Sequence, residues 1–346
     1  MASTIKDIAE YAKVSITTVS RVLNNRPDVK EETRKLVNDT IKKLGYSPNI
    51  VARGLVLKRS NIIGFIIPDI TNPSFPELAR GIVNKARSHG FSVMFYDTNH
   101  DQKVEKEAIR LLRSKQVDGI ILSFNEANKD ELEKLREEHF PVVQIYRKSE
   151  KSCVSTIALD NVKSGYTATK YLIENGHRII GHITTGEQVQ SGSERLKGYR
   201  MALIEAGIAY REELIRVGAN DTESGYSCMG ELLALRKSSA LDAVFVSHDT
   251  MAAGAYDAIL SSGLRIPADI SIISHDNNPI SRQLFPKLTT MDTLKYRLGE
   301  IGVELLIKEM VLGIPQNREI LQECVLIERN SVWKRDTMSS APLSDI

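Results

Sequence analysis

The feature that most constrains this chain is a regular alternation, from Asn61 onward, of short apolar runs with amphipathic stretches. In one such stretch Ala79, Ile82, Val83 and Ala86 recur at helical spacing. Apolar strands that alternate with helices predict parallel sheets covered on both faces. Seven or more such units in about 270 residues divide into two lobes. The expected strands are residues 62–67, 93–96, 119–122, 142–145, 179–183, 243–246 and 270–273.

Polar side chains follow several of these strands. In parallel sheets, ligands bind outside the carboxyl ends of the strands. The positions there combine an aromatic ring, two arginines, carboxylates and hydroxyl groups, which suits a small polyhydroxylated or charged molecule. We therefore expect a cleft formed by Asp69, Ser74, Phe75, Arg147, Asp160, Ser191, Arg195, His248 and Asp276.

Some of these residues have a structural alternative. Asp160 precedes a helix that begins at Asn161, so its alternative role is to cap that helix without touching a ligand. Asp249 is expected to cap its own helix rather than to touch a ligand. Arg195 and Asp276 can form a structural pair, although we favour contact with the ligand.

A different pattern precedes the α/β region and predicts three short helices. Thr4 and Asp7 have the spacing of a capping box at the start of the first helix. After a turn, Ser15 can cap a second helix that begins near Ile16. A third helix is expected over Glu31–Leu44, where it can close a small core on the first two.

The second helix has the pattern of a helix that reads a DNA major groove. Arg21 is the side chain best suited to a bidentate contact with guanine, and a phosphate clamp is its alternative. The residues expected to face the core are Val19, Val22 and Leu23, and those expected to face outward are Thr17, Thr18 and Arg21.

Residues 50–57 form an apolar segment with almost no polar face, followed by Lys58 and Arg59. At eight residues it is shorter than the ~12–15 that make an isolated helix marginal in water, and Gly54 weakens it further. A partner must therefore order it. Two copies from a dimer, packed over a DNA minor groove with Leu55 between base steps, would supply that partner.

Charge and cysteine usage restrict the function further. The net charge of +2 hides a basic head, because residues 1–60 carry +6 and the rest of the chain −4, which suits phosphate contact at one end. No export signal and no run near the ~18 apolar residues of a membrane span is found, so we expect a cytoplasmic protein. The cysteines at 153, 228 and 324 are expected as buried thiols rather than metal ligands, and His177 and His182 as ordinary core or surface groups.

No phosphate loop, nucleophile elbow or His-Glu-x-x-His motif is present, so the sequence predicts no enzyme, no catalytic residue, no metal and no cofactor.

The motifs of the head resemble the lactose/galactose repressor (LacI/GalR) family. The resemblance rests on residues 5–9, 14–15, 18–24, 44–49 and 52–55 and continues to about Trp333. One departure is Lys30, where the family usually has a capping Ser, so we expect a slightly frayed third helix. The resemblance implies four parts: a helix-turn-helix domain (1–47), a hinge helix and linker (48–60), a periplasmic-binding-protein-like body for effector binding and dimerisation (61–334, with crossovers near 160, 290 and 320), and a tail (335–346).

The resemblance also implies roles for individual residues of the head. Ile16, Thr17 and Arg21 would face base edges. The residues that would help fix the phosphate backbone are Ser15, Thr18 and Asn24, with Thr4 and Asn49 among the nearby groups, and those that would enter the minor groove are Ala52 and Leu55.

By motif position the family's effector pocket corresponds to Phe75, Asp160, Ser191, Arg195, His248 and Asp276. His248 stands where sugar-responsive members often carry Asn, and Asn220 where an aromatic ring often stacks on the ligand. Ser274-His275 replaces the usual Gly-aromatic pair. We therefore expect an adapted pocket, with binding that depends on pH.

Together these features predict a transcriptional repressor that binds a pseudo-palindromic DNA operator as a homodimer, controlled by a sugar-like effector. A nucleobase corepressor and a partner phosphoprotein are alternative controls, and a sugar-binding transport protein is a rival function. Residues 334–346 carry no heptad repeat, so a dimer rather than a tetramer is expected. No membrane partner is expected.

Overall fold

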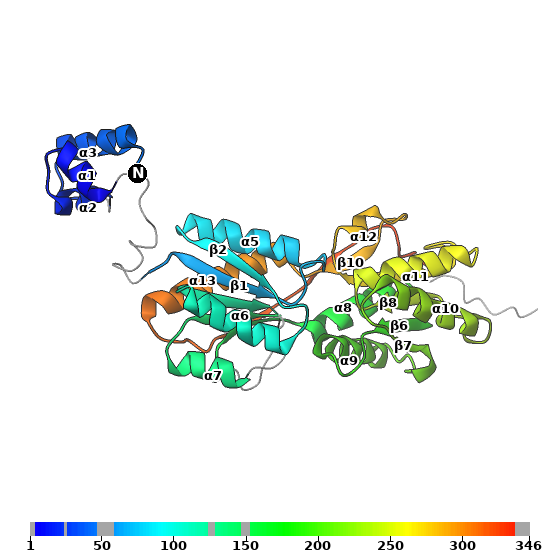
Figure 1. The fold of residues 1–346 in the computed structure, drawn as a ribbon. Helices are drawn as coiled ribbons and strands as arrows, with labels where there is room; N and C mark the ends of the chain where they lie inside the picture. Colours follow the sequence, from blue (N-terminus) through cyan, green and yellow to red (C-terminus); the bar gives the residue numbers. More distant parts are fainter. Residues whose placement is uncertain (1–3, 24–25, 47–58, 124–128, 147–152, 336–346) are drawn as a thin grey trace, which may run out of the picture. The chain divides into compact units, whose positions relative to one another are not determined.

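The computed structural model describes the whole chain except residues 1–3, 24–25, 47–58, 124–128, 147–152 and 336–346. It divides into two units, Met1–Asn61 and Ile62–Ile346, whose elements are drawn in Figure 1. Within the described residues, no helix has the length and apolar character needed to cross a membrane.

The first unit is a three-helix bundle of α1 (Ile5–Tyr11), α2 (Ile16–Leu23) and α3 (Glu31–Leu44). The capping box forms as expected, since the Asp7 amide donates to Thr4 Oγ1 and the Thr4 amide donates to the Asp7 carboxylate at 2.7 Å. Lys30 supplies no side-chain cap, but α3 still begins at Glu31. The core of the unit consists of Ile8, Ala9, Ala12, Val19, Val22 and Val37.

Lobe 1 of the second unit is a six-stranded parallel sheet with the order β11-β5-β4-β3-β1-β2. Its strands are β1 (Ile62–Ile67), β2 (Ser92–Asp97), β3 (Gly119–Ser123), β4 (Val142–Ile145), β5 (Ser155–Leu159) and β11 (Glu319–Gln322). The side chains of alternate strand residues pack against helices on opposite faces. One face carries α5 (Phe75–Ser88) and α13 (Lys295–Leu312), and the other carries α6 (Gln102–Ser114) and α7 (Lys129–Glu137).

Lobe 2 repeats this plan with the order β12-β10-β9-β8-β6-β7, in which only β12 is antiparallel to its neighbour. Its strands are β6 (Ile180–Thr184), β7 (Ile215–Val217), β8 (Ala243–Val246), β9 (Ser271–Asp276), β10 (Thr289–Asp292) and β12 (Val325–Ile327). The helices α8 (Asn161–Glu174) and α9 (Gln190–Glu205) cover one face. The other face carries α10 (Thr222–Ser239) and α11 (Asp249–Ser261), and short η1 (Glu212–Leu214) and α12 (Ile280–Gln283) complete the lobe.

The chain passes between the two sheets three times: after β5, after β10, and between β11 and β12. The expected crossovers near residues 160, 290 and 320 correspond to these passages. Strand β10 was not among the predicted strands because its sequence, Thr-Thr-Met-Asp, is mostly polar. Thr289 and Thr290 are nevertheless fully buried, and the strand pairs with β9 on one side and β12 on the other.

The contact between α5 and α13 predicts a specific sensitivity to substitution. A Cβ atom at Gly81 would collide with the backbone carbonyl of Tyr296, whereas a Cβ at Gly230 in α10 would meet nothing within 4 Å. Gly81→Ala should therefore lower the free energy of unfolding by about 1–3 kcal/mol. The control Gly230→Ala should leave it unchanged or raise it by up to ~1 kcal/mol, since Ala favours a helix. Urea denaturation of the full chain measures both, and equal effects would contradict this packing.

Candidate functional site

The second helix of the head presents the residue pattern expected of a recognition helix. Ser15 caps it, since the Thr18 amide donates to Ser15 Oγ at 3.0 Å. Val19 and Val22 face the core. The side chains exposed on this helix are those of Ile16, Thr17 and Arg21.

Arg21 is half-exposed and forms an ion pair with Asp28, with 3.3 Å between Nη1 and Oδ2. An exposed pair of this kind contributes at most about 1 kcal/mol. The guanidinium can therefore leave Asp28 for a base edge or a phosphate at little energetic cost. Four of the predicted DNA contacts lie outside the described residues: Asn24, Asn49, Ala52 and Leu55.

A cavity of about 750 Å³ lies between the two lobes of the body. Both lobes line it, at the carboxyl ends of their strands, as expected for parallel sheets. Of the predicted effector residues it brings together Asp69, Ser74, Phe75, Ser191, Arg195, Asn220, His248 and Asp276. Arg147 lies outside the described residues.

Asp160 is not among the residues that line the cavity. Its Oδ1 accepts a hydrogen bond from the Lys163 amide at 2.9 Å, so it caps α8. This carboxylate therefore has the structural role of a helix cap, and the neighbouring residue Asn161 lines the cavity instead.

Other lining residues escaped the sequence reasoning, among them His100, Tyr146, Asn161 and Thr293. His100, Tyr146 and Asn161 follow strands β2, β4 and β5, so the rule that located the other site residues applies to them too. Thr293 follows β10, which the sequence does not predict because it contains no apolar run.

Arg195 forms the floor of the cavity and is 3% exposed. Its Nε donates to Asn161 Oδ1 at 3.0 Å, and its Nη1 donates to the Ser247 carbonyl at 2.6 Å. Burial lowers the pKa of this arginine, opposed by the charge of Asp276. No ion pair joins Arg195 directly to Asp276 among the described contacts, so the structural pair considered from the sequence does not form.

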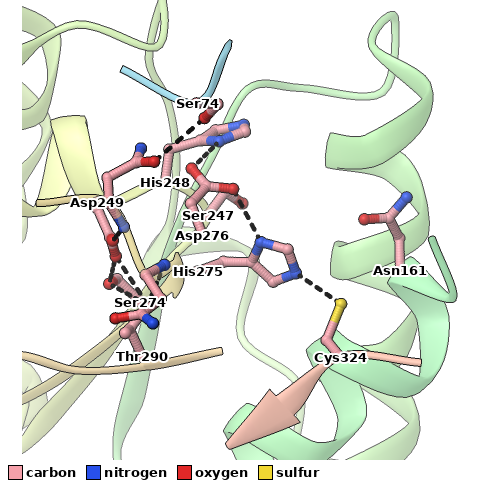
Figure 2. Close-up of polar contacts among 12 residues, drawn as sticks. Ser74, Asn161, Ser247, His248, Asp249, Ser274, His275, Asp276, Thr290 and Cys324 are labelled. Atoms are coloured by element: carbon pink, nitrogen blue, oxygen red, sulfur yellow. Dashed lines mark hydrogen bonds and ion pairs between the residues drawn. The ribbon is translucent and has the colours of Figure 1, made fainter. Parts of the chain in front are cut away.

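Asp276 instead lies between two imidazoles, as Figure 2 shows. His248 Nδ1 is 3.0 Å from Oδ2, and His275 Nδ1 is 3.1 Å from Oδ1. Burial raises the pKa of Asp276, but the charge facing it on His248 and the hydrogen bonds from both histidines lower it well below its usual value. The carboxylate is therefore ionised and only accepts, so both Nδ1 atoms carry hydrogen.

The chain of contacts continues from His275 to Cys324 (Figure 2), with 3.6 Å between Nε2 and Sγ. Burial lowers the pKa of His275 to about 3, and burial raises the pKa of Cys324 to about 12. A neutral imidazole with hydrogen on Nδ1 accepts at Nε2, so the Cys324 thiol donates to it. This cysteine is a structural thiol.

The prediction that Asp249 caps its own helix was wrong. His248 is the N-cap of α11, and the Asp249 carboxylate turns inward to β9 and β10, where it is fully buried. It accepts hydrogen bonds from the hydroxyls of Ser274 and Thr290 and from the Asn278 amide. These three donors, from residues distant in sequence, stabilise the Asp249 side chain more than the exposed end of the helix would.

His182 belongs to the core, as expected. Its ring stacks between Tyr199 and Phe245, and Nδ1 lies 2.9 Å from the Phe245 carbonyl. Burial lowers the pKa of His182 to about 4, so it is neutral at physiological pH. His177 is also buried and contacts the Trp333 carbonyl.

Comparison with known proteins relates both units to the same family. Residues 4–49 match the bacterial regulatory proteins of the lacI family, and residues 60–322 match the periplasmic binding proteins and sugar binding domain of the LacI family. The chain belongs to the LacI family. It is a DNA-binding transcriptional regulator, and the family and fold class predicted from the sequence are confirmed.

Individual relatives match over almost their full length. The HTH-type transcriptional regulator RegA of Clostridium acetobutylicum is 36% identical over 96% of this chain and 99% of its own. The lac repressor dimer bound to operator and the anti-inducer ONPF is 26% identical, with a TM-score of 0.85 over 96% of this chain and all of that one. The complex of the regulator CelR with cellobiose is 28% identical, with a TM-score of 0.71 over 95% of this chain and 99% of that one.

The burial of Asp249 predicts a pH dependence of stability. Burial and the nearby Asp276 raise the pKa of Asp249 to about 7 in the folded chain, against about 4 when unfolded. Because the folded pKa is the higher one, the stabilising contribution is complete below pH ~4 and is lost as the pH rises to about 7. Asp249→Asn should therefore give a flatter dependence of the free energy of unfolding on pH between 4 and 7.

Denaturant unfolding at several pH values measures this dependence. The control is Asp257→Asn, which removes an exposed carboxylate from the same helix and should keep the wild-type slope. A wild-type slope in Asp249→Asn would show that this carboxylate is ionised in the folded protein.

Proposed function

We propose that this regulator binds an operator with two half-sites as a homodimer and represses transcription. We also propose that a small sugar-like molecule in the interlobe cavity controls its affinity for DNA. The observation that carries the proposal is that the cavity floor is hydrogen-bonded to all three crossovers. A ligand on that floor therefore acts on the segments about which the lobes move.

Each crossover has its own contact with the floor. At the first, Asn161 accepts from Arg195. At the second, the ammonium group of Lys295, itself 1% exposed, donates to the backbone carbonyl of Asp276. At the third, Cys324 contacts His275, which in turn binds Asp276. A ligand that displaces either Arg195 or Asp276 must disturb these contacts.

A fourth contact bridges the lobes across the cavity. Ser74, at the start of α5 in lobe 1, donates to Asn278 Oδ1 in lobe 2 at 3.3 Å, and both residues line the cavity. A ligand between them would exchange this weak bond for its own contacts. Its differential affinity for the two arrangements of the lobes would set their populations.

The effector class is proposed from the cavity and from a relative. The cavity holds hydroxyl, amide and charged side chains, which suit a sugar or a sugar derivative, and a similar regulator is described in complex with cellobiose. A nucleobase corepressor and a partner protein are the alternative controls. A dimer is supported by the lac repressor, which is described as a dimer on its operator.

The DNA half of the proposal is tested by selecting binding sites from random duplexes with the full chain. We expect a pseudo-palindromic consensus with two half-sites. Arg21→Gln should change the preferred base at one position in each half-site and weaken the original site by about 1–3 kcal/mol. Lys35→Gln, which removes an exposed charge from α3, should keep the consensus. An unchanged consensus with uniformly weaker binding of Arg21→Gln would assign Arg21 to a phosphate instead.

The hinge proposal is tested by Leu55→Ala. If Leu55 of each protomer enters the minor groove and keeps the duplex kinked, its loss should weaken specific binding by about tenfold or more. Non-specific binding at low salt should stay nearly unchanged, because phosphate contacts supply it. Fluorescence anisotropy with specific and scrambled duplexes separates the two, and equal losses on both would contradict the proposed wedge.

A further inference from the structure

The acceptors on the cavity floor are already engaged. Each carboxylate oxygen of Asp276 accepts an imidazole N–H, from His248 and His275 respectively, and its backbone carbonyl accepts from Lys295. A ligand hydroxyl that donates to Asp276 would have to share these oxygens with a histidine or displace it. Asp276 is therefore a poor acceptor for hydrogen bonds from a ligand.

The hydrogen-bond donor on the floor, the guanidinium of Arg195, still has donor capacity. Arg195 donates through Nε and Nη1, and Nη2 has no hydrogen-bond partner among the residues that the structure describes. The side chain is 97% buried, at 3% exposure, but it lines the cavity. A buried cation with an unfilled donor is costly. A planar guanidinium is well suited to carboxylate and phosphate oxygens.

Two helix N-termini add to this donor surface. The N-cap residues of α9 and α11 are Val189 and His248, both of which line the cavity. Neither helix has a hydrogen bond from a side-chain cap. The first amides of these helices, with their positive dipole ends, favour negative charge in the cavity that Arg195 also lines.

The rim of the cavity has the opposite character. Asp69, Asn220, Asp221 and Glu223 line it. Asp69 Oδ1 already accepts from the amide and hydroxyl of Thr71, and Asp221 caps α10 through the Ser224 amide. The remaining carboxylate and amide oxygens accept hydrogen bonds, so the rim suits ligand hydroxyls and disfavours a second anionic group.

We propose that the effector carries one carboxylate or phosphate group, bound by Arg195 at the floor, and hydroxyl groups that donate to the rim. Its chemical class is a sugar acid or a sugar phosphate rather than a neutral sugar or a nucleobase. This inference rests on the proposed function and narrows the ligand of the same cavity.

The test compares matched ligands on the full chain by isothermal titration calorimetry at constant ionic strength. The probes are glucose, glucuronate and glucose 6-phosphate; galactose and galacturonate; and ribose and ribose 5-phosphate. At least one charged member should bind about tenfold or more tightly than its neutral parent. Whether the acids or the phosphates have that preference identifies the source of the anionic group.

Variants assign the preference to Arg195. Arg195→Gln should abolish the preference for the charged ligand, and Arg195→Lys, which keeps the charge, should retain part of it. The control is Arg200→Gln, which removes an arginine one turn further along α9 that stacks on Tyr210 outside the cavity. It should bind like the wild type. Circular dichroism of each variant checks that the chain is folded, and Arg195→Lys keeps the test valid if Arg195→Gln does not fold.

The inference is overturned if a neutral parent binds as tightly as its charged derivative, if no acid or phosphate of the panel binds, or if Arg195→Gln keeps the preference. A neutral sugar that binds and changes operator affinity would overturn this inference while supporting the proposed function. A charged ligand that needs Arg195 but leaves operator affinity unchanged would support the inference and contradict the proposed control of DNA binding.

Discussion

The body of this protein depends on a buried polar cluster where its two lobes meet. Arg195 and Asp276 are both ionisable and both nearly inaccessible, and each is held by hydrogen bonds from or to residues at the crossovers. A buried charge is costly wherever one of its polar atoms lacks a partner. The arrangement of the lobes and the hydrogen bonding of this cluster are therefore linked, and under the proposed function a ligand that reaches the cluster would change both.

Under the proposed function, this linkage would let one set of residues serve both stability and control. Lys295 and Cys324 do not line the cavity, but they contact the residues that form and support its floor. The buried carboxylate of Asp249 accepts a hydrogen bond from the amide of Asn278. Ser74 of the other lobe donates to the side chain of the same Asn278. In the proposed mechanism, a movement of the floor would be transmitted to the crossovers and to the bridge between the lobes. In a LacI-family regulator, such a movement can be read by the DNA-binding unit.

Much of this could be predicted from the sequence, because the determinants are local. The capping box of Thr4 and Asp7 and the cap at Ser15 depend on residues three apart. The alternation of apolar strands with helices locates the sheets, and the ends of the strands locate most of the cavity wall.

The parts that were missed depend on contacts between distant segments. Asp249 looks like a helix cap in the sequence, but Ser274 and Thr290 draw its carboxylate inward. Strand β10 is polar in sequence, and one of its threonines, Thr290, donates its hydroxyl to Asp249 in that same buried cluster. The contact of His248 with Asp276 depends on the pairing of β8 with β9, which the spacing of the two residues in the sequence does not show.

The most direct test of the central claim is reciprocal binding. An effector that controls DNA binding through the cavity must change the operator's dissociation constant by a certain factor, and the operator must change the effector's dissociation constant by the same factor. Calorimetric titration of the effector into the full chain, with and without saturating operator DNA, measures this. The account predicts a change of about 5- to 150-fold, equal in both directions; an effector affinity that operator DNA leaves unchanged would contradict it.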